Sequence, residues 1–364
     1  MEKFAFIIHP LDTTDIFRKF PQAKKLPESF LENCFRHLPS FAVSSITGIK
    51  SATGAEASGW FIACPITSRL MFDLPEEYVL RKISGAAKLA ERLGAGIVGL
   101  GALTSVVGDA GVTIAKNVRI PVTTGNSFTV ATALRGIRRA SQLMELDLSE
   151  ANLAVIGATG SIGKACARIM AKQVKELTLI GRNSENLSRL AQEITASEST
   201  KVSVSTDIST ALGQVDVVIT VTSAVDTVIK PHYLKSGAIV CDVARPRDVS
   251  RRVAEARRDV LVFEGGVVQV PGSVDFGFNF GFPPGTAYAC MAETMMLALE
   301  KRYEPFSLGR DLTVEQVMEI DCLAEKHGFS LAGLRSFERA LDEREILAIK
   351  HRIKGAKAMA AGLS

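Results

Sequence analysis

The sequence lacks the features that define several broad classes of protein. Its six cysteines are scattered, without a CxxC pair or a clustered His/Cys spacing, so it predicts no metal site and no disulfide framework. The net charge of +4 is too small to indicate a nucleic-acid partner. The longest uncharged stretch, residues 276–292, contains three glycines and two prolines, and a membrane-spanning helix needs about 20 apolar residues. We therefore expect no membrane span.

From the N-terminal residues we expect no targeting signal. The apolar run at residues 4–8 is too short for a signal peptide, and no small-residue cleavage site follows it. With no disulfide framework, this predicts a reducing, cytoplasmic setting. The 364 residues are 47% apolar and 23% charged, a balance typical of a folded protein with two or three domains.

Apolar runs alternate with helical patterns through most of the chain and predict an α/β fold. A strand at residues 4–8, a helix at 76–93 and a strand at 97–100 indicate an α/β domain over residues 1–145. Residues 146–285 continue with six continuous apolar runs separated by helical stretches, which is typical of a doubly wound, Rossmann-type parallel sheet. The six predicted strands are residues 153–156, 177–180, 202–204, 217–221, 238–242 and 261–263.

Helices dominate the remaining segment, residues 286–364. The pattern predicts helices at 286–301, 313–326 and 333–360, the second with a capping box from Thr313 to Gln316 and a stop at Gly328. We expect this segment to pack back on the N-terminal domain. Expected helix caps elsewhere are Asn126 or Ser127, Ser184, Thr206 and Asp248.

A glycine-rich turn follows the first strand of the middle domain and opens a helix. The sequence Gly157-Ala-Thr-Gly160-Ser-Ile-Gly163 lets backbone N–H groups approach a pyrophosphate at the helix N-terminus. The second strand ends at Arg182 where an NAD site would usually have an acidic residue, and an arginine suits the 2′-phosphate of NADPH. The predicted cofactor-binding residues are Gly157, Thr159, Gly160, Ser161, Ile162, Gly163, Arg182, Asn183, Thr222, Ser223, Gly265 and Gly266.

Cys290 differs from the other cysteines because it follows a Gly/Pro loop and lies in the first turns of a predicted helix. A helix N-terminus favours the thiolate form of a cysteine. A thiolate beside a nicotinamide suits reduction of a thioester through an acyl-enzyme. Position alone leaves two interpretations open, a nucleophile and a buried helix cysteine. Cys34, Cys166, Cys241 and Cys322 are expected in the core. Cys64 is expected to be a buried cysteine that lines a pocket, and the alternative is a second nucleophile.

Several segments together resemble one family. They are Thr123-Thr-Gly-Asn126, residues 155–163, Gly266-Val-Val, Ala289-Cys290-Met-Ala-Glu293, Gly309-Arg310 and Lys326-His-Gly-Phe329. In this order they resemble the cyanobacterial long-chain fatty acyl-(acyl-carrier-protein) reductases. The resemblance implies an oxidoreductase of lipid metabolism that uses NADPH to convert acyl carrier protein or coenzyme A thioesters into fatty aldehydes. The nucleophilic cysteine of that family corresponds to Cys290 in this sequence. The resemblance therefore implies a thioester intermediate on Cys290.

The implied chemistry needs donors for two oxyanions. The expected donors are backbone N–H groups at the start of the helix at Thr286 and the side chains of Thr124, Asn126 and Ser127. His9, at the end of the first strand, is either a proton donor or a structural histidine. Glu293 either orients active-site groups or offsets the helix dipole, and His327 is expected to be a helix C-terminal cation.

The predicted partners follow from the same resemblance. They are an acyl carrier protein or coenzyme A thioester and an aldehyde-processing enzyme, and a homo-oligomer is compatible with the sequence. Basic groups at residues 350–357 and at Arg245, Arg247, Arg251 and Arg252 could bind an acidic carrier or be solvated surface. Two alternatives remain open: a shikimate-dehydrogenase-like oxidoreductase, and a non-catalytic NADP-binding sensor.

Overall fold

The computed structural model describes residues 1–224, 226–337 and 339–361 and divides the chain into two compact units. Unit 1 consists of residues 1–129 and 268–330, and unit 2 consists of residues 130–267 and 331–364. The sequence placed domain boundaries near residues 145 and 285. Residues 331–364 belong to the C-terminal segment that we expected to pack on the N-terminal domain, but they cluster with unit 2 instead. No helix of the described residues is long and apolar enough to cross a bilayer.

Unit 1 is built on a six-stranded mixed sheet. Its order is β13 (Gly272–Asp275), β2 (Phe41–Lys50), β3 (Glu56–Ala63), β1 (Glu2–Ile8), β4 (Ile97–Leu100) and β5 (Val122–Thr123). The pairs β13–β2 and β2–β3 are antiparallel, and the pairs from β3 to β5 are parallel. The edge strand β13 lies far along the chain from the other five strands. Residues 268–330 therefore add a strand to a sheet that residues 1–129 begin.

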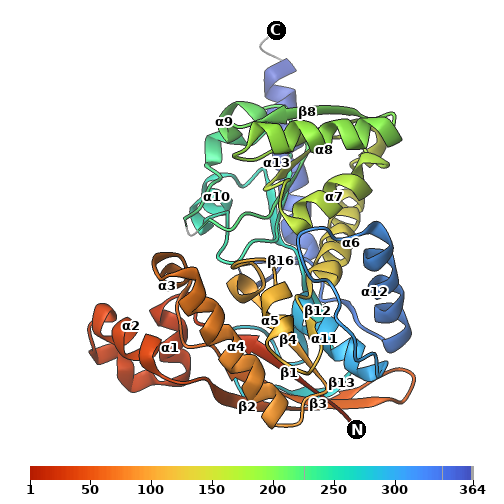
Figure 1. Ribbon diagram of the computed structural model, residues 1–364. Coiled ribbons are helices and arrows are strands. Elements are labelled where there is room, and N and C mark those ends of the chain that lie inside the picture. Colours follow the sequence, from red (N-terminus) through yellow and green to blue (C-terminus); the bar gives the residue numbers. More distant parts are fainter. Residues whose placement is uncertain (225, 338, 362–364) are drawn as a thin grey trace. The chain divides into compact units, whose positions relative to one another are not determined.

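Helices cover both faces of this sheet because alternate residues of a strand point to opposite sides. Ala5 and Ile7 of β1 pack in one cluster with the apolar stripe of α4 (Glu76–Arg92). On the other side, α11 (Ala289–Leu299) packs against β1 and β4 (Figure 1). A Cβ on Gly99 of β4 would lie 2.0 Å from Thr294 Oγ1, so α11 approaches the sheet closely there.

Shorter elements complete unit 1. They are α1 (Thr13–Lys19), α2 (Glu28–His37), α3 (Ser68–Asp73), α5 (Val112–Lys116), α12 (Val314–His327), β12 (Val267–Gln269), β14 (Thr286–Tyr288) and β15 (Ser330–Leu331). The last three strands pair in a small sheet of their own. The capping box of Thr313 with Gln316 and the stop at Gly328, with φ +85°, are confirmed.

Unit 2 is a doubly wound parallel sheet, as predicted. Its order is β11 (Leu261–Glu264), β10 (Ile239–Asp242), β9 (Val217–Thr220), β6 (Asn152–Ile156), β7 (Glu176–Ile180) and β8 (Lys201–Ser205). The chain starts in the middle at β6, runs outward to β8 and then crosses to β9, which is the Rossmann order. The helices are α6 (Asn126–Met144), whose first turn belongs to unit 1, α7 (Ser161–Ala171), α8 (Ser184–Ser197), α9 (Ile208–Ala211), α10 (Arg251–Ala256) and α13 (Glu343–Ala361).

Five predicted helix starts or helix caps differ from the structure. The expected helix at 286 begins at Ala289, because residues 286–288 pair as β14, and the expected helix at 333 begins at Glu343 after the strands β16 (Arg335–Ser336) and β17 (Arg339–Ala340). Asn183 and Asp207 cap α8 and α9 in place of their neighbours Ser184 and Thr206. Asp248 is no cap, since Ser250 takes that position at α10.

Candidate active site

Cys290 is the second residue of α11 and is half-buried. The N-cap residue Tyr288 makes no side-chain hydrogen bond to the helix start. The first N–H groups of a helix have no intrahelical acceptor and carry the positive end of its dipole. The thiol therefore lies where a thiolate, and an oxyanion formed on its acyl adduct, would be stabilised.

The other five cysteines occupy different environments. Cys64, Cys166 and Cys241 are buried, and burial raises the pKa of Cys64 and of Cys166 to about 12. Cys34 and Cys322, expected in the core, are exposed. They lie inside α2 and α12 and not at a helix N-terminus. Cys290 is thus the one cysteine of the six that combines partial exposure with a helix N-terminal position.

The segment from Thr123 to Phe128 runs from the end of β5 into the first turn of α6 and lies directly against the start of α11. We call it the loop at residues 123–128. Gly125 has φ +72°, and a Cβ at this position would lie 2.2 Å from Cys290 Cα and 2.3 Å from Cys290 Cβ. Only a glycine fits here, since it supplies the left-handed backbone and leaves room for the cysteine. The Thr-Gly-Asn motif is therefore in contact with the candidate nucleophile.

Glu293 fastens this loop to α11 from one helical turn beyond Cys290. Its carboxyl is fully buried; Oε1 accepts the Thr123 hydroxyl at 2.5 Å, and Oε2 accepts the Phe128 N–H at 2.9 Å. Burial raises the pKa of Glu293, while these donors act in the opposite direction. Of the two roles considered from the sequence, the contacts favour the orienting one.

Ser307 holds the same loop from a third segment. Thr124 Oγ1 donates to the Ser307 carbonyl at 2.5 Å, and the Ser127 and Ser307 hydroxyls are 2.5 Å apart. The Thr124 and Ser127 hydroxyls, predicted as oxyanion donors, are therefore used to fix the loop. Asn126 is buried at the start of α6. Ser307 carries no motif that sequence reasoning could have used, although its φ of +53° is unusual for a residue other than glycine.

His9 is engaged at both ring nitrogens. Nε2 accepts the Leu103 N–H at 3.2 Å, so Nδ1 carries the proton and donates to the Pro10 carbonyl at 3.0 Å. Burial lowers the pKa of His9 to about 4. A neutral imidazole with its proton held by a carbonyl fits the structural alternative better than the proton donor.

His327 is not the exposed helix C-terminal cation that the sequence suggested. It is buried, with Nδ1 2.8 Å from Ser51 Oγ and Nε2 2.6 Å from Glu300 Oε1. Burial lowers the pKa of His327. Its contacts join the end of α12 to the β2–β3 turn.

In unit 2, the turn between β6 and α7 has the geometry of a pyrophosphate cradle. Gly157 has φ +83°, and a Cβ on Gly163 would lie 2.2 Å from the Gly157 carbonyl oxygen. Gly160 is the N-cap of α7 and brings no side chain to cover the helix start. Thr159, Ser161 and Ile162 complete the turn. All these predicted residues fit an NADP(H) pyrophosphate at the N-terminus of α7.

Arg182 lies just past β7, where a Rossmann unit places the adenosine ribose. Among the described residues, none forms a hydrogen bond or ion pair with its guanidinium. The neighbouring Asn183 is the N-cap of α8 and accepts the Asn186 N–H at 2.9 Å. The guanidinium is thus available to a 2′-phosphate, whereas the side-chain oxygen Oδ1 of Asn183 already caps α8.

The other predicted cofactor residues lie at the carboxyl ends of β9 and β11. Thr222 donates through N–H and Oγ1 to the two carboxylate oxygens of Asp248, at 2.9 and 2.5 Å, and Ser223 follows it. Gly265 packs against Cys241 Sγ, which would lie 2.8 Å from an added Cβ, and Gly266 turns the chain with φ +87°. Sequence reasoning missed the structural role of Asp248, a buried carboxyl whose pKa is raised by burial.

The basic groups considered for carrier binding are largely used within unit 2. Lys350 is 15% exposed and pairs with Glu145, and Arg352 donates to the Arg258 carbonyl at 3.3 Å. Arg247 pairs with Glu264 at 2.7 Å, and Arg251 stacks over Phe337. The side chain of Lys357 lies outside the described residues.

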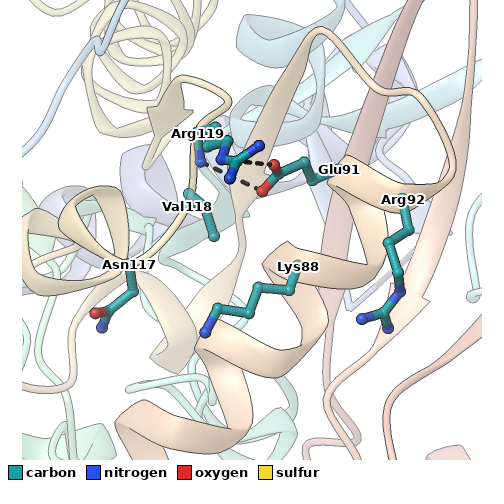
Figure 2. A pocket seen from close by; sticks show the side chains of 6 residues that line it. All are labelled: Lys88, Glu91, Arg92, Asn117, Val118 and Arg119. Atoms are coloured by element: carbon teal, nitrogen blue, oxygen red, sulfur yellow. Dashed lines mark hydrogen bonds and ion pairs between the residues drawn. The ribbon is translucent and has the colours of Figure 1, made fainter.

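A shallow pocket of about 410 Å³ lies in unit 1 between α4 and the segment after α5 (Figure 2). It is lined by Lys88, Glu91, Arg92, Asn117, Val118 and Arg119. Arg119 faces Glu91, with Nε 3.9 Å from the carboxylate and the backbone N–H 3.3 Å from it. The lining holds no thiol and no hydroxyl and none of the predicted site residues, so it plays no part in the chemistry considered below.

A family model described as Shikimate / quinate 5-dehydrogenase matches residues 138–264, the strands and helices that carry the cradle. Together with the cradle geometry, this match identifies residues 138–264 as a Rossmann-type cofactor unit of the kind found in NAD(P)-dependent oxidoreductases. Its cofactor is NADPH, as the sequence predicted.

Three similar proteins extend the comparison. Aminotransferase PigE of a Serratia strain is 31% identical over 96% of this chain, but the chain spans only 42% of that protein. The long-chain acyl-(acyl-carrier-protein) reductase of Synechococcus elongatus is 28% identical over 81% of this chain and 89% of its own length. The crystal structure of L-tryptophan dehydrogenase from Nostoc punctiforme aligns over 97% of this chain and 89% of its own, with 14% identity and a TM-score of 0.40.

Replacing Arg182 with alanine is expected to weaken NADPH binding about 10- to 100-fold, because a charge-assisted hydrogen bond to the 2′-phosphate is lost. Binding of NADH, which has no such phosphate, should change little. Titration of cofactor fluorescence measures both. Arg189→Ala is the matched control, since Arg189 lies on α8 and pairs with Glu185. Equal losses for the two cofactors would contradict the assignment.

Proposed function

We propose that this chain uses NADPH to reduce long-chain fatty acyl thioesters to aldehydes through an acyl-enzyme on Cys290. The observation that carries the proposal is the clamped, half-exposed Cys290 at the start of α11, held by Gly125 and Glu293. The 28% identity with a protein named as a long-chain acyl-(acyl-carrier-protein) reductase, over 81% of this chain, supports the same reaction.

The first half-reaction uses only residues of unit 1. The Cys290 thiolate attacks the thioester carbonyl, and the negative charge moves to the carbonyl oxygen. The N–H groups at the start of α11, which the side chain of the N-cap residue Tyr288 does not cap, are the first candidate donors for this oxyanion, and the Asn126 amide is a second. Collapse of the adduct breaks the bond to the carrier sulfur, which leaves as a thiolate and takes up a proton, while the acyl group stays on Cys290.

The second half-reaction consumes the acyl-enzyme. Bound NADPH supplies the hydride that the acyl carbon needs. The new tetrahedral oxyanion uses the same donors, then collapses to the aldehyde and returns the electron pair to Cys290 sulfur. Glu293 is not a proton carrier in this scheme, because both its oxygens are occupied by Thr123 and Phe128. Its part is to keep the loop and the helix start in register.

The proposed partners follow from this chemistry. Acyl carrier protein and coenzyme A present the same phosphopantetheine thiol, so either can serve as the leaving group. The product aldehyde is reactive, which makes an aldehyde-consuming enzyme the natural next step.

The alternative of an alcohol oxidoreductase rests on the match of residues 138–264 to the Shikimate / quinate 5-dehydrogenase model. That match covers the cofactor-binding strands and helices and none of the Cys290 site. An alcohol oxidoreductase would also leave the contacts of Gly125 and Glu293 around the start of α11 without a role in catalysis.

The experiment mixes purified protein with NADPH and palmitoyl coenzyme A or palmitoyl carrier protein. NADPH absorbance is followed, and the products are extracted and analysed for aldehyde. We expect NADPH loss with one aldehyde formed per NADPH consumed. NADPH binding without turnover on either thioester, together with oxidation of a hydroxy acid by NADP⁺, would replace the proposal with the alternative.

A further inference from the structure

The segment between β13 and β14 carries a short tandem repeat rich in phenylalanine. It reads Asp275-Phe-Gly-Phe278 followed by Asn279-Phe-Gly-Phe282. Each copy begins with the same local turn: the Asp275 carboxylate accepts the Gly277 N–H at 2.8 Å, and the side-chain amide oxygen Oδ1 of Asn279 accepts the Gly281 N–H at 2.8 Å. Both glycines have positive φ, +60° and +102°. The repeat therefore builds the same turn twice and presents its rings in a regular series.

The rings form a continuous series of contacts that ends at Tyr288, two residues before Cys290 in the sequence. Ring centroids are 5.1 Å apart for Phe276–Phe280, 5.9 Å for Phe280–Phe282 and 4.6 Å for Phe282–Tyr288, all edge-to-face. Phe61 of β3 joins the series, 5.8 Å from Phe276 and 5.5 Å from Phe280. We call Phe61, Phe276, Phe280, Phe282 and Tyr288 the aromatic row. Phe278, also half-buried, is 6.2 Å from Phe280 and lies beneath the Lys19 ammonium.

Burial changes along the row. Phe61 and Phe276 are buried in the core of unit 1, whereas Phe280, Phe282 and Tyr288 are only half-buried. The half-buried end is the one nearer to Cys290 along the chain, since Tyr288 is the N-cap residue of α11 and Cys290 is the second residue of that helix. Contiguous apolar surface that folding leaves partly uncovered is characteristic of a binding surface. Here it lies on the chain segment that delivers the candidate nucleophile.

We propose that the aromatic row receives the hydrocarbon tail of the acyl group carried on Cys290, so that the substrates are thioesters with long, unbranched apolar chains. This inference rests on the proposed function for the identity of the ligand. The row offers one apolar ring after another at steps of 4.6 to 5.9 Å, starting at the helix that holds the thiol.

The test uses N-alkyl maleimides of increasing length, N-ethyl, N-hexyl and N-dodecyl, whose reaction needs a thiol but neither NADPH nor a thioester. The rate of modification at Cys290 is measured by peptide mass spectrometry on the full chain. The exposed Cys322 of the same chain serves as the internal reference for reagent length. Relative to Cys322, we expect Cys290 to react about tenfold faster or more with the dodecyl reagent than with the ethyl reagent, because the tail gains apolar contact.

Variants locate the effect. Phe280→Ala and Phe282→Ala should reduce this preference to the value seen at Cys322, and Phe280→Leu should retain part of it. Phe72→Ala is the matched control: Phe72 is an exposed phenylalanine of unit 1 outside the row. A preference that is absent in the unmodified chain, or unchanged in both alanine variants, would overturn the proposal. Thermal unfolding of each variant identifies any that does not fold.

A second measurement separates this proposal from the proposed function. Calorimetric titration of dodecanoate into the Cys290→Ala chain, with and without Phe280→Ala, reports tail binding when no chemistry can occur. If tail binding depends on Phe280 but the unmodified chain, with Cys290 present, reduces no thioester, the aromatic row is supported and the reductase reaction is rejected. If the chain forms aldehyde from short and long thioesters at equal rates and binds no dodecanoate, the reductase reaction is supported and the aromatic row is rejected as the tail-binding site.

Discussion

Replacement of Cys290 by alanine is expected to abolish aldehyde formation, with a loss of roughly 10⁴-fold or more, because the acyl-enzyme can no longer form. NADPH binding should be unchanged, since the cradle residues belong to β6 and α7 of the other unit. The fold should also tolerate the change, because alanine is a good helix former and the thiol is only half-buried. The measurements are the rate of aldehyde formation and a cofactor titration on the same preparation.

Cys322→Ala provides the control for this prediction. It removes an exposed thiol from another helix of the same unit and should leave the rate within about twofold of the parent chain, as expected for a surface substitution. If Cys290→Ala retained a substantial fraction of the activity, the acyl-enzyme scheme would have to be abandoned. Equal losses in both variants would point to a general effect of thiol removal.

Replacement of Gly125 by alanine is the second substitution with a large expected effect. The added Cβ would lie 2.2 Å from Cys290 Cα, so either the loop at residues 123–128 or the start of α11 must move. The left-handed backbone at φ +72° adds its own cost. We expect a destabilisation of about 3 kcal/mol or more. Because a misplacement near 1 Å can cost about 100-fold in rate, kcat should fall by at least that factor.

Gly54→Ala separates the cost of the close contact with Cys290 from the cost of the left-handed backbone. Gly54 has φ +85°, but a Cβ there would meet nothing within 4 Å. It therefore carries the left-handed strain alone, about 1 kcal/mol, and should leave kcat unchanged. Chemical denaturation and steady-state kinetics on the two variants make the comparison. If Gly125→Ala behaved like Gly54→Ala in both measurements, the contact between the loop and Cys290 would have no functional weight.

The cofactor unit was predictable from sequence because its signals are local. Six largely apolar runs, a Gly-rich turn and an arginine after the second strand lie within one stretch of chain, and each run forms one strand of the observed parallel sheet. The strand limits agree to within one or two residues. Helix starts were less accurate, since Asn183 and Ser184, or Thr206 and Asp207, are equally plausible caps when read side by side.

The candidate active site could be predicted only in part because it depends on long-range contacts. Cys290 and the motif at residues 123–126 could be identified singly, but their direct contact joins segments 165 residues apart. Ser307 enters through contacts with Thr124 and Ser127 that no local pattern encodes. His327 shows the same effect in reverse: its position at a helix end suggested a cation, whereas tertiary contacts with Ser51 and Glu300 bury it.

The strand β14 has a similar explanation. Residues 286–288 continue into α11 without a helix breaker, so the sequence pattern extends the helix back to Thr286. Pairing with β12 overrides this local preference and moves the helix start to Ala289. The shift places Cys290 nearer the helix N-terminus than the sequence suggested, which strengthens the case for a stabilised thiolate.

The most direct test of the account is to look for the acyl-enzyme itself. The protein is incubated with palmitoyl coenzyme A without NADPH, quenched in acid and analysed by intact-mass and peptide mass spectrometry. The account predicts one palmitoyl group on the peptide containing Cys290, which disappears when NADPH is added and aldehyde is released. An unmodified Cys290 peptide, or palmitoylation confined to the exposed Cys34 and Cys322, would contradict it.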